Sequence, residues 1–318
     1  MTREGQADQV KLKIVGVIII LLSMLAQACS TPVVSRQHSG MRAASGPPQD
    51  FGGIKKKVAL LTFFNDSPHG GDELAVTATE EIRRELSRTG HFIIDPMGAT
   101  LYGDSREVYA GGGSKLPQVS RQARVQGINF VVYGRVVEAR VRERTDEIGM
   151  IRKTRTYSEA VVEVRVHDVN SGKEILNETL RGHADDDSYR FFMGDQEEHL
   201  AHRREMLRYA VRVATRQSIP QIIGATEKLE WVGRVARIIG NKIYINAGRR
   251  SGIHISDILR VMTDGQEIYD PETGALIGVS RGEVKGTLEV IDYFGADGSI
   301  AILHSGGSVH EGDFVTLY

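Results

Sequence analysis

The sequence predicts an α+β protein, with a mixed-sheet α/β sandwich domain at residues 55–224 and a small all-β domain at residues 231–318. In the first segment, apolar runs of strand length alternate with amphipathic helical segments, a pattern typical of helices packed on a sheet. In the second segment, short apolar runs recur between Gly, Asn and Asp turn residues, which is typical of a barrel or sandwich.

Residues 1–28 have the features of a secretory signal peptide. A slightly basic start precedes an apolar run at residues 14–25, and this run is shorter than the roughly 20 residues of a spanning helix. Ala26-Gln27-Ala28 then forms a small-residue cleavage site. Cleavage there makes Cys29, the one cysteine of the chain, the first residue of the mature protein. Its sulfur is then free to take a lipid; plain secretion and an uncleaved anchor are the alternatives.

The stretch LSMLAQACST resembles the bacterial lipobox, in which the lipidated cysteine becomes residue one. Ala26 departs from that pattern, which has Leu most often at this position. By resemblance to lipoprotein sorting in enteric bacteria, Ser30 in place of Asp favours the outer membrane. Residues 29–54 are rich in Ser, Gly and Pro, so we expect a lipidated N-terminus followed by a flexible tether.

The elements of the α/β domain follow from apolar spacing and turn residues. Leu74, Ala78, Ile82 and Leu86 recur every four residues on an amphipathic helix that Asp72 caps and Gly90 ends. A second helix is predicted to pack on the core through four apolar residues near helical spacing: Leu200, Leu207, Val211 and Ala214. The expected order is a buried strand at 58–64, that first helix, a strand at 91–95, a loop at 97–116, a helix at 117–126, strands at 128–141, 158–169 and 174–182, and a helix at 196–219.

The second domain shows strand signals alone. Turns such as Gly240-Asn241 and Asp270-Pro271-Glu272-Thr273-Gly274 separate the apolar runs. These runs predict a small, SH3-like barrel or sandwich, with strands at 232–239, 242–247, 257–262, 286–294, 299–304 and 313–318.

Several residue groups invite a chemical interpretation, and each has a simpler one. Gly111-Gly112-Gly113-Ser114-Lys115 places Ser before Lys and follows no buried strand, so it is a flexible loop and not a phosphate loop. His167-Asp168 could form a metal site with His183 and residues 185–187, but neighbours in a strand point to opposite faces. His199 and His202 share a helix face without a third ligand.

The sequence therefore predicts neither a catalytic nor a cofactor or metal site, and Cys29 cannot serve as a nucleophile from the tether. Ser-His-Asp, G-x-S-x-G and H-E-x-x-H patterns are missing from the chain. We expect a protein that is not an enzyme. The net charge of -1 gives no basic excess that would suggest nucleic acid.

Two resemblances suggest a role. Residues 55–223, with KVALLTFFNDS, EIRRELSRTGHFIIDP and GINFVVYGRVVE, resemble the curli-secretion lipoprotein family (CsgG-like) and the N-terminal domain of TolB-type periplasmic proteins. The second segment, with VGRVARIIGNKIYINAGRRSG, IYDPETGALIG and EGDFVTLY, resembles the C-terminal domain of flagellar assembly protein T (FlgT). That protein belongs to a periplasmic ring of the flagellar motor and also has a TolB-like middle domain. The separate N-terminal domain of that protein has no counterpart here.

The resemblances imply a periplasmic structural lipoprotein, held at the outer membrane by its lipid, that helps to assemble or brace an envelope structure. A flagellar basal-body ring is the favoured version, with envelope proteins as partners and a homo-oligomeric ring as a further expectation. A curli-type export subunit would place membrane hairpins near 138–160 and 182–203. Charges in both stretches, among them Glu143, argue against a pore. A binding module that senses a periplasmic ligand or a peptidoglycan synthase is the third hypothesis, and an apolar groove between the domains would favour it.

Overall fold

A mixed sheet organises the α/β part of the chain. The computed structural model describes residues 52–110, 115–148, 151–191 and 196–318. The sheet has the order β3-β1-β4-β5-β6, and β2 pairs with β4. Strands β1, β3 and the start of β4 run parallel, whereas β4, β5 and β6 form an antiparallel meander. The strands are β1 (Lys56–Leu60), β2 (Phe64–Asn65), β3 (Phe92–Ile94), β4 (Phe130–Ile148), β5 (Ile151–Asp168) and β6 (Lys173–Phe191).

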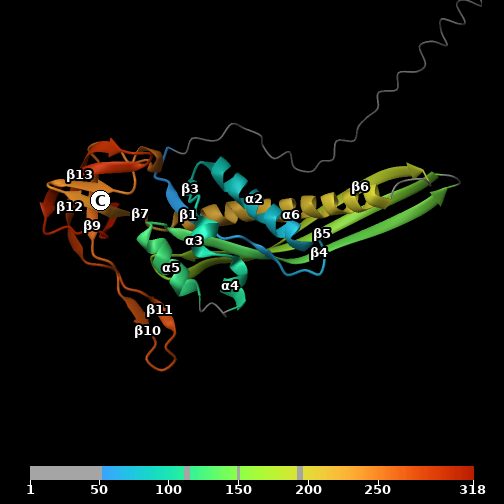
Figure 1. The fold of residues 1–318 in the computed structure, drawn as a ribbon, viewed down its shortest axis with the longest axis horizontal. Helices are drawn as coiled ribbons and strands as arrows, with labels where there is room; N and C mark the ends of the chain where they lie inside the picture. Colours follow the sequence, from blue (N-terminus) through green and yellow to red (C-terminus); the bar gives the residue numbers. More distant parts are fainter. Residues whose placement is uncertain (1–51, 111–114, 149–150, 192–195) are drawn as a thin grey trace, which may run out of the picture. The chain divides into compact units, whose positions relative to one another are not determined.

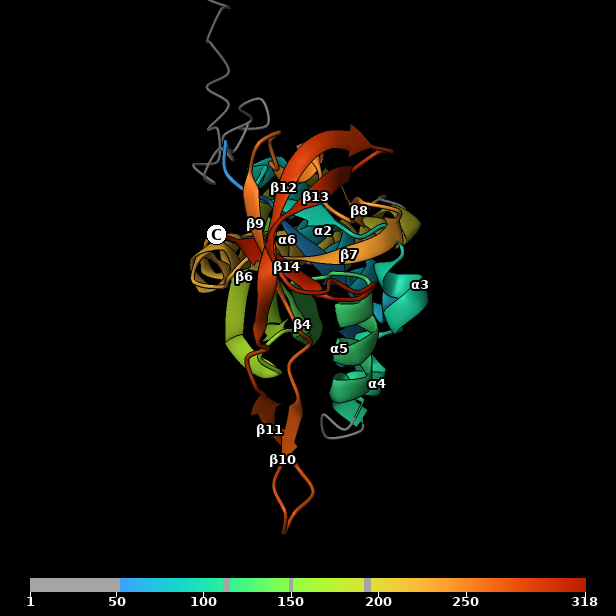
Figure 2. The same cartoon turned by 90° about the vertical axis from the view of Figure 1, so that its left-hand side faces the viewer.

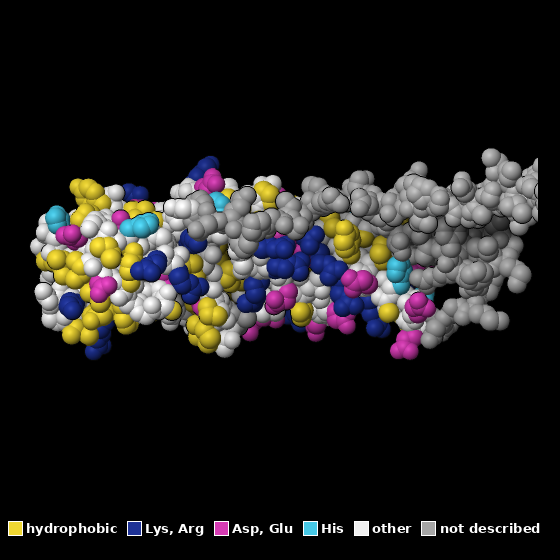
Figure 3. All heavy atoms as spheres, turned by 90° about the horizontal axis from the view of Figure 1, so that it is seen from above, with side chains coloured by type: hydrophobic (Ala, Val, Ile, Leu, Met, Phe, Trp, Pro, Cys, Tyr) yellow, Lys and Arg dark blue, Asp and Glu magenta, His cyan; other side chains and the backbone are white. Residues whose placement is uncertain are grey.

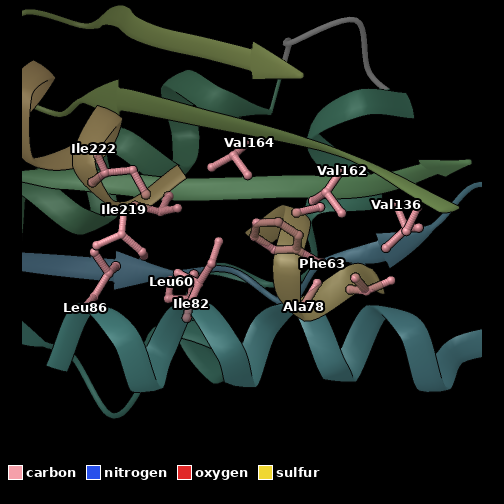
Figure 4. Close-up of a cluster of buried hydrophobic side chains, with 14 of the residues drawn as sticks. Leu60, Phe63, Ala78, Ile82, Leu86, Val136, Val162, Val164, Ile219 and Ile222 are labelled. Atoms are coloured by element: carbon pink, nitrogen blue, oxygen red, sulfur yellow. The ribbon is translucent and has the colours of Figure 1, made fainter. Parts of the chain in front are cut away.

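Helices cover both faces of this sheet, as the predicted sandwich requires (Figure 1). Helices α2 (Gly71–Thr89) and α6 (Gln196–Glu227) pack on one face. Helices α3 (Gly98–Tyr102), α4 (Ser105–Ala110) and α5 (Leu116–Val125) lie on the other face, over a second apolar cluster. Figure 4 shows side chains of α2 and α6 meeting those of β1, β4 and β5 between the layers.

The C-terminal part is a closed barrel with the strand order β12-β13-β8-β7-β14-β9 (Figure 2). Closure leaves no strand edge open in the barrel, and its interior is filled by side chains such as Leu288 and Val290. The strands are β7 (Val232–Ile239), β8 (Lys242–Ile245), β9 (Ile258–Met262), β12 (Val284–Phe294), β13 (Gly298–Gly306) and β14 (Phe314–Leu317); β10 (Glu267–Tyr269) and β11 (Leu276–Val279) form a separate hairpin, and η1 (Arg249–Ser251) is a short 3-10 turn. The predicted fold class is confirmed in both parts.

Two local predictions about the first half are wrong. Within the loop predicted at 97–116, the described residues form α3 and α4, which bury Tyr102 and Val108 against the sheet. Asp72 does not cap α2. The helix begins at Gly71, after Gly70 in the left-handed conformation, and Asp72 lies in its first turn, where a negative charge favours the positive end of the helix dipole. Gly90 ends this helix as predicted.

The meander and the last helix are longer than predicted. Strands β4 and β5 stay paired as far as Ile148 and Ile151, and β6 continues to Phe191. The described residues of 138–160 are therefore two paired antiparallel strands, whereas those of 182–203 belong to the end of β6 and the start of α6. Helix α6 also passes through Pro220, although proline removes one backbone hydrogen bond. Ile222, two residues beyond, is fully buried, so packing supports the extra turns.

Glu143, which interrupts the apolar pattern of β4, has partners on α6. Ala139 is buried and Val141 packs against the same core. Glu143 lies 3.1 Å from Nε2 of His199 and 3.6 Å from Nε of Arg203. Ala139, Val141 and Glu143 alternate along β4 and therefore share the face of the strand that meets α6. No described helix is long and apolar enough to cross a membrane.

Candidate functional site

The exposed sides of α2 and α6 carry a concentration of arginine. Arg204, Arg208, Arg212 and Arg216 recur every four residues along α6, so they share one side of the helix. Arg84 and Arg88 lie on the adjacent side of α2. Figure 3 views the molecule from this side and shows Lys and Arg side chains gathered along the two helices. We call these six arginines the basic face.

Three glutamates hold the basic face together without neutralising it. Glu81 is almost fully buried and accepts hydrogen bonds from Arg84 of its own helix and Arg216 of α6. Glu85 lies 3.3 Å from Arg88, and Glu205 lies 3.3 Å from Arg208 and 2.5 Å from Arg212. Six guanidinium groups therefore face three carboxylates, in a chain whose net charge is -1.

This arrangement is suited to binding an anionic partner. Guanidinium groups present several donors in a fixed fork that matches carboxylate and phosphate oxygens. Each exposed ion pair contributes only about 0–1 kcal/mol, so the pairs with half-exposed Glu205 can exchange for pairs with a partner at little cost, whereas those with buried Glu81 stay in place. The spacing of Arg204 to Arg216 was a signal in the sequence that the apolar analysis of this helix missed.

A second charged cluster, on the opposite face of the sheet, is fully paired. Glu163 accepts hydrogen bonds from Arg135 at 2.7 Å and Arg165 at 2.6 Å, and both guanidiniums stack on the ring of Tyr109. Burial opposes ionisation of Glu163, but the two guanidiniums outweigh it and lower its pKa. Burial, followed by the charge of Glu163, raises the pKa of Tyr109. This cluster attaches α4 to the sheet, so its role is structural.

The residues of the metal interpretation do not come together. His167 is buried, and Asp168 accepts hydrogen bonds from the amides of Asn170 and Ser171 at the turn after β5. His183 and Asp185 are exposed on β6, while Asp186 and Asp187 fall where side chains are not described. Among the described residues, no group of three or more His, Cys, Asp or Glu could hold a metal ion.

The remaining candidate positions are either paired or lie outside the described residues. His199 is next to Glu143, as given above, and His202 also has an interaction partner. Lys115 lies 2.8 Å from Glu107, whereas residues 111–114 lie outside the described residues. The same holds for Cys29, the signal peptide at 1–28 and nearly all of the tether, so lipidation of Cys29 stays a prediction.

A small cavity of about 190 Å³ lies where the α/β part meets the barrel. Lys57, Asp95, Arg250 and Asp297 contribute to its lining, together with Ile93 and Ile94. Lys57 lies 3.7 Å from Asp297, and burial lowers the pKa of its amine. The lining of this cavity is therefore mixed and charged, and it does not provide the apolar groove that would favour a ligand sensor.

Comparisons with known proteins give low similarity. No protein-family model matches the chain, and a search of curated proteins finds no match. Among solved structures, a hypothetical protein from Chlamydia trachomatis is 18% identical with a TM-score of 0.34, over 54% of this chain and 98% of that one. A lipoprotein from Neisseria meningitidis is 14% identical with a TM-score of 0.27, over 53% and 99%. The C-terminal domain of LpoB from Salmonella enterica is 14% identical with a TM-score of 0.25, over 40% and 82%. Scores this low carry no argument about function.

Proposed function

We propose that this protein is a non-enzymatic envelope lipoprotein that helps to assemble or brace a structure in the periplasm, with the basic face as its main contact for an anionic partner. The observation that carries the proposal is the local excess of arginine over glutamate on the basic face, where six arginines face three glutamates. Protein surfaces with one dominant sign of charge attract partners of the opposite sign and speed their association. In the second charged cluster, by contrast, the charged side chains around Glu163 pair with one another.

The anchoring part of the proposal is supported by the sequence. The apolar run at 14–25, the cleavage site that follows it and Cys29 at the expected mature N-terminus match a lipoprotein signal. A lipid on Cys29 would hold the folded residues near the outer membrane through the tether at 29–54. More than one acyl chain is needed for firm anchoring.

The most specific version is a component of a flagellar basal-body ring. It is supported by the resemblance of residues 231–318 to the C-terminal domain of flagellar assembly protein T and by the order of the two domains. A curli-type secretion component, suggested by the resemblance of residues 55–223, is the alternative. In both versions the protein is a structural or transport component, with envelope proteins as its partners.

The test is purification of hook–basal bodies from the native host, followed by detection of this protein in the wild-type strain and in a Cys29→Ala strain. We expect co-purification in the wild type and its loss in the Cys29→Ala strain. Absence from wild-type basal bodies, with presence in the outer-membrane fraction, would overturn the flagellar version and favour the curli-type alternative.

The contact surface is tested separately in the same preparation. A double variant, Arg208→Gln with Arg212→Gln, removes two of the six positive charges of the basic face and leaves the pairs of buried Glu81 with Arg84 and Arg216 intact. We expect the double variant to associate more weakly with the partner than the wild type does. We also expect wild-type association to weaken at high salt, because exposed charges are screened. Arg237→Gln, on the barrel and paired with Glu311 at 3.5 Å, is the matched control. Equal association of the double variant and the control would contradict the role of the basic face.

A further inference from the structure

Three buried nitrogen-bearing side chains lie near the place where α5 packs on the barrel, with Arg124 close enough to both of the others to affect their pKa. Arg124 of α5, Arg234 of β7 and His167 of β5 are 6%, 7% and 4% exposed. Asp264, in the connection from β9 to β10, lies 3.9 Å from Nη1 of Arg124 and 3.6 Å from Nη2 of Arg234. Two guanidiniums from different parts of the chain therefore share one carboxylate, which is itself half-exposed.

Their hydrogen bonding is incomplete. Arg124 donates from Nη2 to the carbonyl of Val169 at 3.1 Å, and Arg234 donates from Nη1 to the carbonyl of Gly312 at 2.6 Å. Within the described part of the chain, Nε of both arginines and both ring nitrogens of His167 are buried without a hydrogen-bond partner. A neutral imidazole carries one N–H, so the cluster holds three unpaired N–H donors. A buried polar group left unpaired costs about 1–3 kcal/mol, so these donors indicate a missing acceptor.

The charge balance of the cluster points to the same kind of acceptor. Burial lowers the pKa of Arg234. The negative charge of Asp264 raises this pKa, and the positive charge of Arg124 lowers it again. Asp313 also faces Arg234, but it lies 2.7 Å from Nζ of Lys285. Among the described residues, Asp264 is the one carboxylate within ion-pair distance of both arginines. A positive charge is thus left over in a place shielded from water.

We propose that Arg124, Arg234 and His167 form a binding site for a small inorganic oxyanion of the phosphate or sulfate class. The donors come from three elements, and an anion with several oxygens can accept from all of them, whereas burial excludes a larger ligand. Guanidinium donors suit such oxygens, and the low dielectric strengthens each contact. The anion links α5 to the barrel and so stabilises the junction between the two parts. This inference does not depend on the function proposed above.

The experiment uses the full chain without its signal peptide, in a buffer free of phosphate and sulfate. Sodium phosphate is titrated at constant ionic strength against sodium chloride, and binding is followed by calorimetry and by the melting temperature. We expect saturable binding and a saturable rise in melting temperature. Arg124→Gln should weaken binding at least about tenfold, because a charged hydrogen bond contributes about 1.5–3 kcal/mol. Arg121→Gln, on the same helix and 3.4 Å from Glu267, should bind as the wild type does.

Asp264→Asn gives a result that a merely structural role would not produce. Removal of the one shared carboxylate should lower the stability of the protein without phosphate but tighten phosphate binding several-fold, because the guanidiniums lose their competing anion. Asp264 is half-exposed, so this variant tests the proposal even if Arg124→Gln fails to fold. A wild-type response that does not saturate, an equal response in Arg124→Gln, or unchanged or weaker binding in Asp264→Asn would each overturn the proposal.

Discussion

Buried His167 should make the protein less stable below neutral pH, and the size of the effect follows from its surroundings. Burial, followed by the charge of Arg124, lowers the pKa of His167 from 6.5 to about 4. In the unfolded chain the imidazole has its ordinary pKa, so between these two values the unfolded state binds more protons than the folded state. Stability is therefore fully present above about pH 6.5 and is lost as the pH falls toward about 4.

The magnitude can be worked out from the same two values. A difference of about 2.5 pKa units corresponds to about 3 kcal/mol in total, since each unit is worth about 1.4 kcal/mol. Between about pH 7.5 and about pH 5, the part that is lost is about 2 kcal/mol. Small domains have stabilities of about 5–15 kcal/mol, so a change of this size is easily measured.

The assay is urea unfolding at about pH 7.5 and about pH 5 in phosphate-free buffer, for the wild type and for His167→Gln. The glutamine cannot titrate in this range, so the wild type should lose about 2 kcal/mol more than the variant between the two pH values. His183→Gln, at an exposed histidine on the neighbouring strand β6, should keep the wild-type slope. Parallel pH profiles for the wild type and His167→Gln would refute the reasoning, because the buried imidazole would then not be the titrating group.

Three further predictions concern packing and the paired cluster. Gly182→Ala should destabilise the protein by about 1–3 kcal/mol, because a Cβ there would lie 2.0 Å from the carbonyl oxygen of Ala210 on α6; urea unfolding checks it, and unchanged stability would contradict the close packing. Leu288→Ala in the fully buried barrel core should cost about 2–5 kcal/mol in the same assay. Glu163→Gln should cost about 1.5–3 kcal/mol, since it removes charged hydrogen bonds from Arg135 and Arg165 to a buried carboxylate; a change below about 1 kcal/mol would show that water and the second partners, Asp66 and Glu174, replace it.

The fold was predictable where local pattern and packing agree. Leu74 and Leu86 recur at helical spacing, and both are buried on α2, so periodicity alone located that helix. The short helices α3 and α4 were missed because five or six residues carry too little periodicity to be distinguished from a loop. Leu200 was expected in the core but is 49% exposed, because α6 at that point lies near the end of the meander.

The candidate sites differ in how much the sequence could tell. The basic face leaves a local signal, because arginines at every fourth position must share a side of a helix. The cluster of Arg124, His167 and Arg234 leaves none, because its members are brought together only when α5, β5 and β7 meet. A histidine in a strand that alternates apolar and polar residues looks the same whether its ring is hydrogen-bonded or not. Burial and missing partners are properties of the packed chain, and spacing cannot reveal them.

Helix α6 connects the packing argument to the proposed contact surface. Its inner side is held against the meander by buried Leu207 and Val211 and by the close approach at Gly182. The same rotation of the helix that buries these residues turns Arg208 and Arg212 outward next to α2. Substitutions on the two sides should therefore separate stability from binding: Gly182→Ala should lower the unfolding free energy, whereas the arginine double variant should lower partner association with the unfolding free energy almost unchanged. If both variants lowered stability by similar amounts, the arginines would be holding the helices together, and the basic face would be a structural network like that around Glu163.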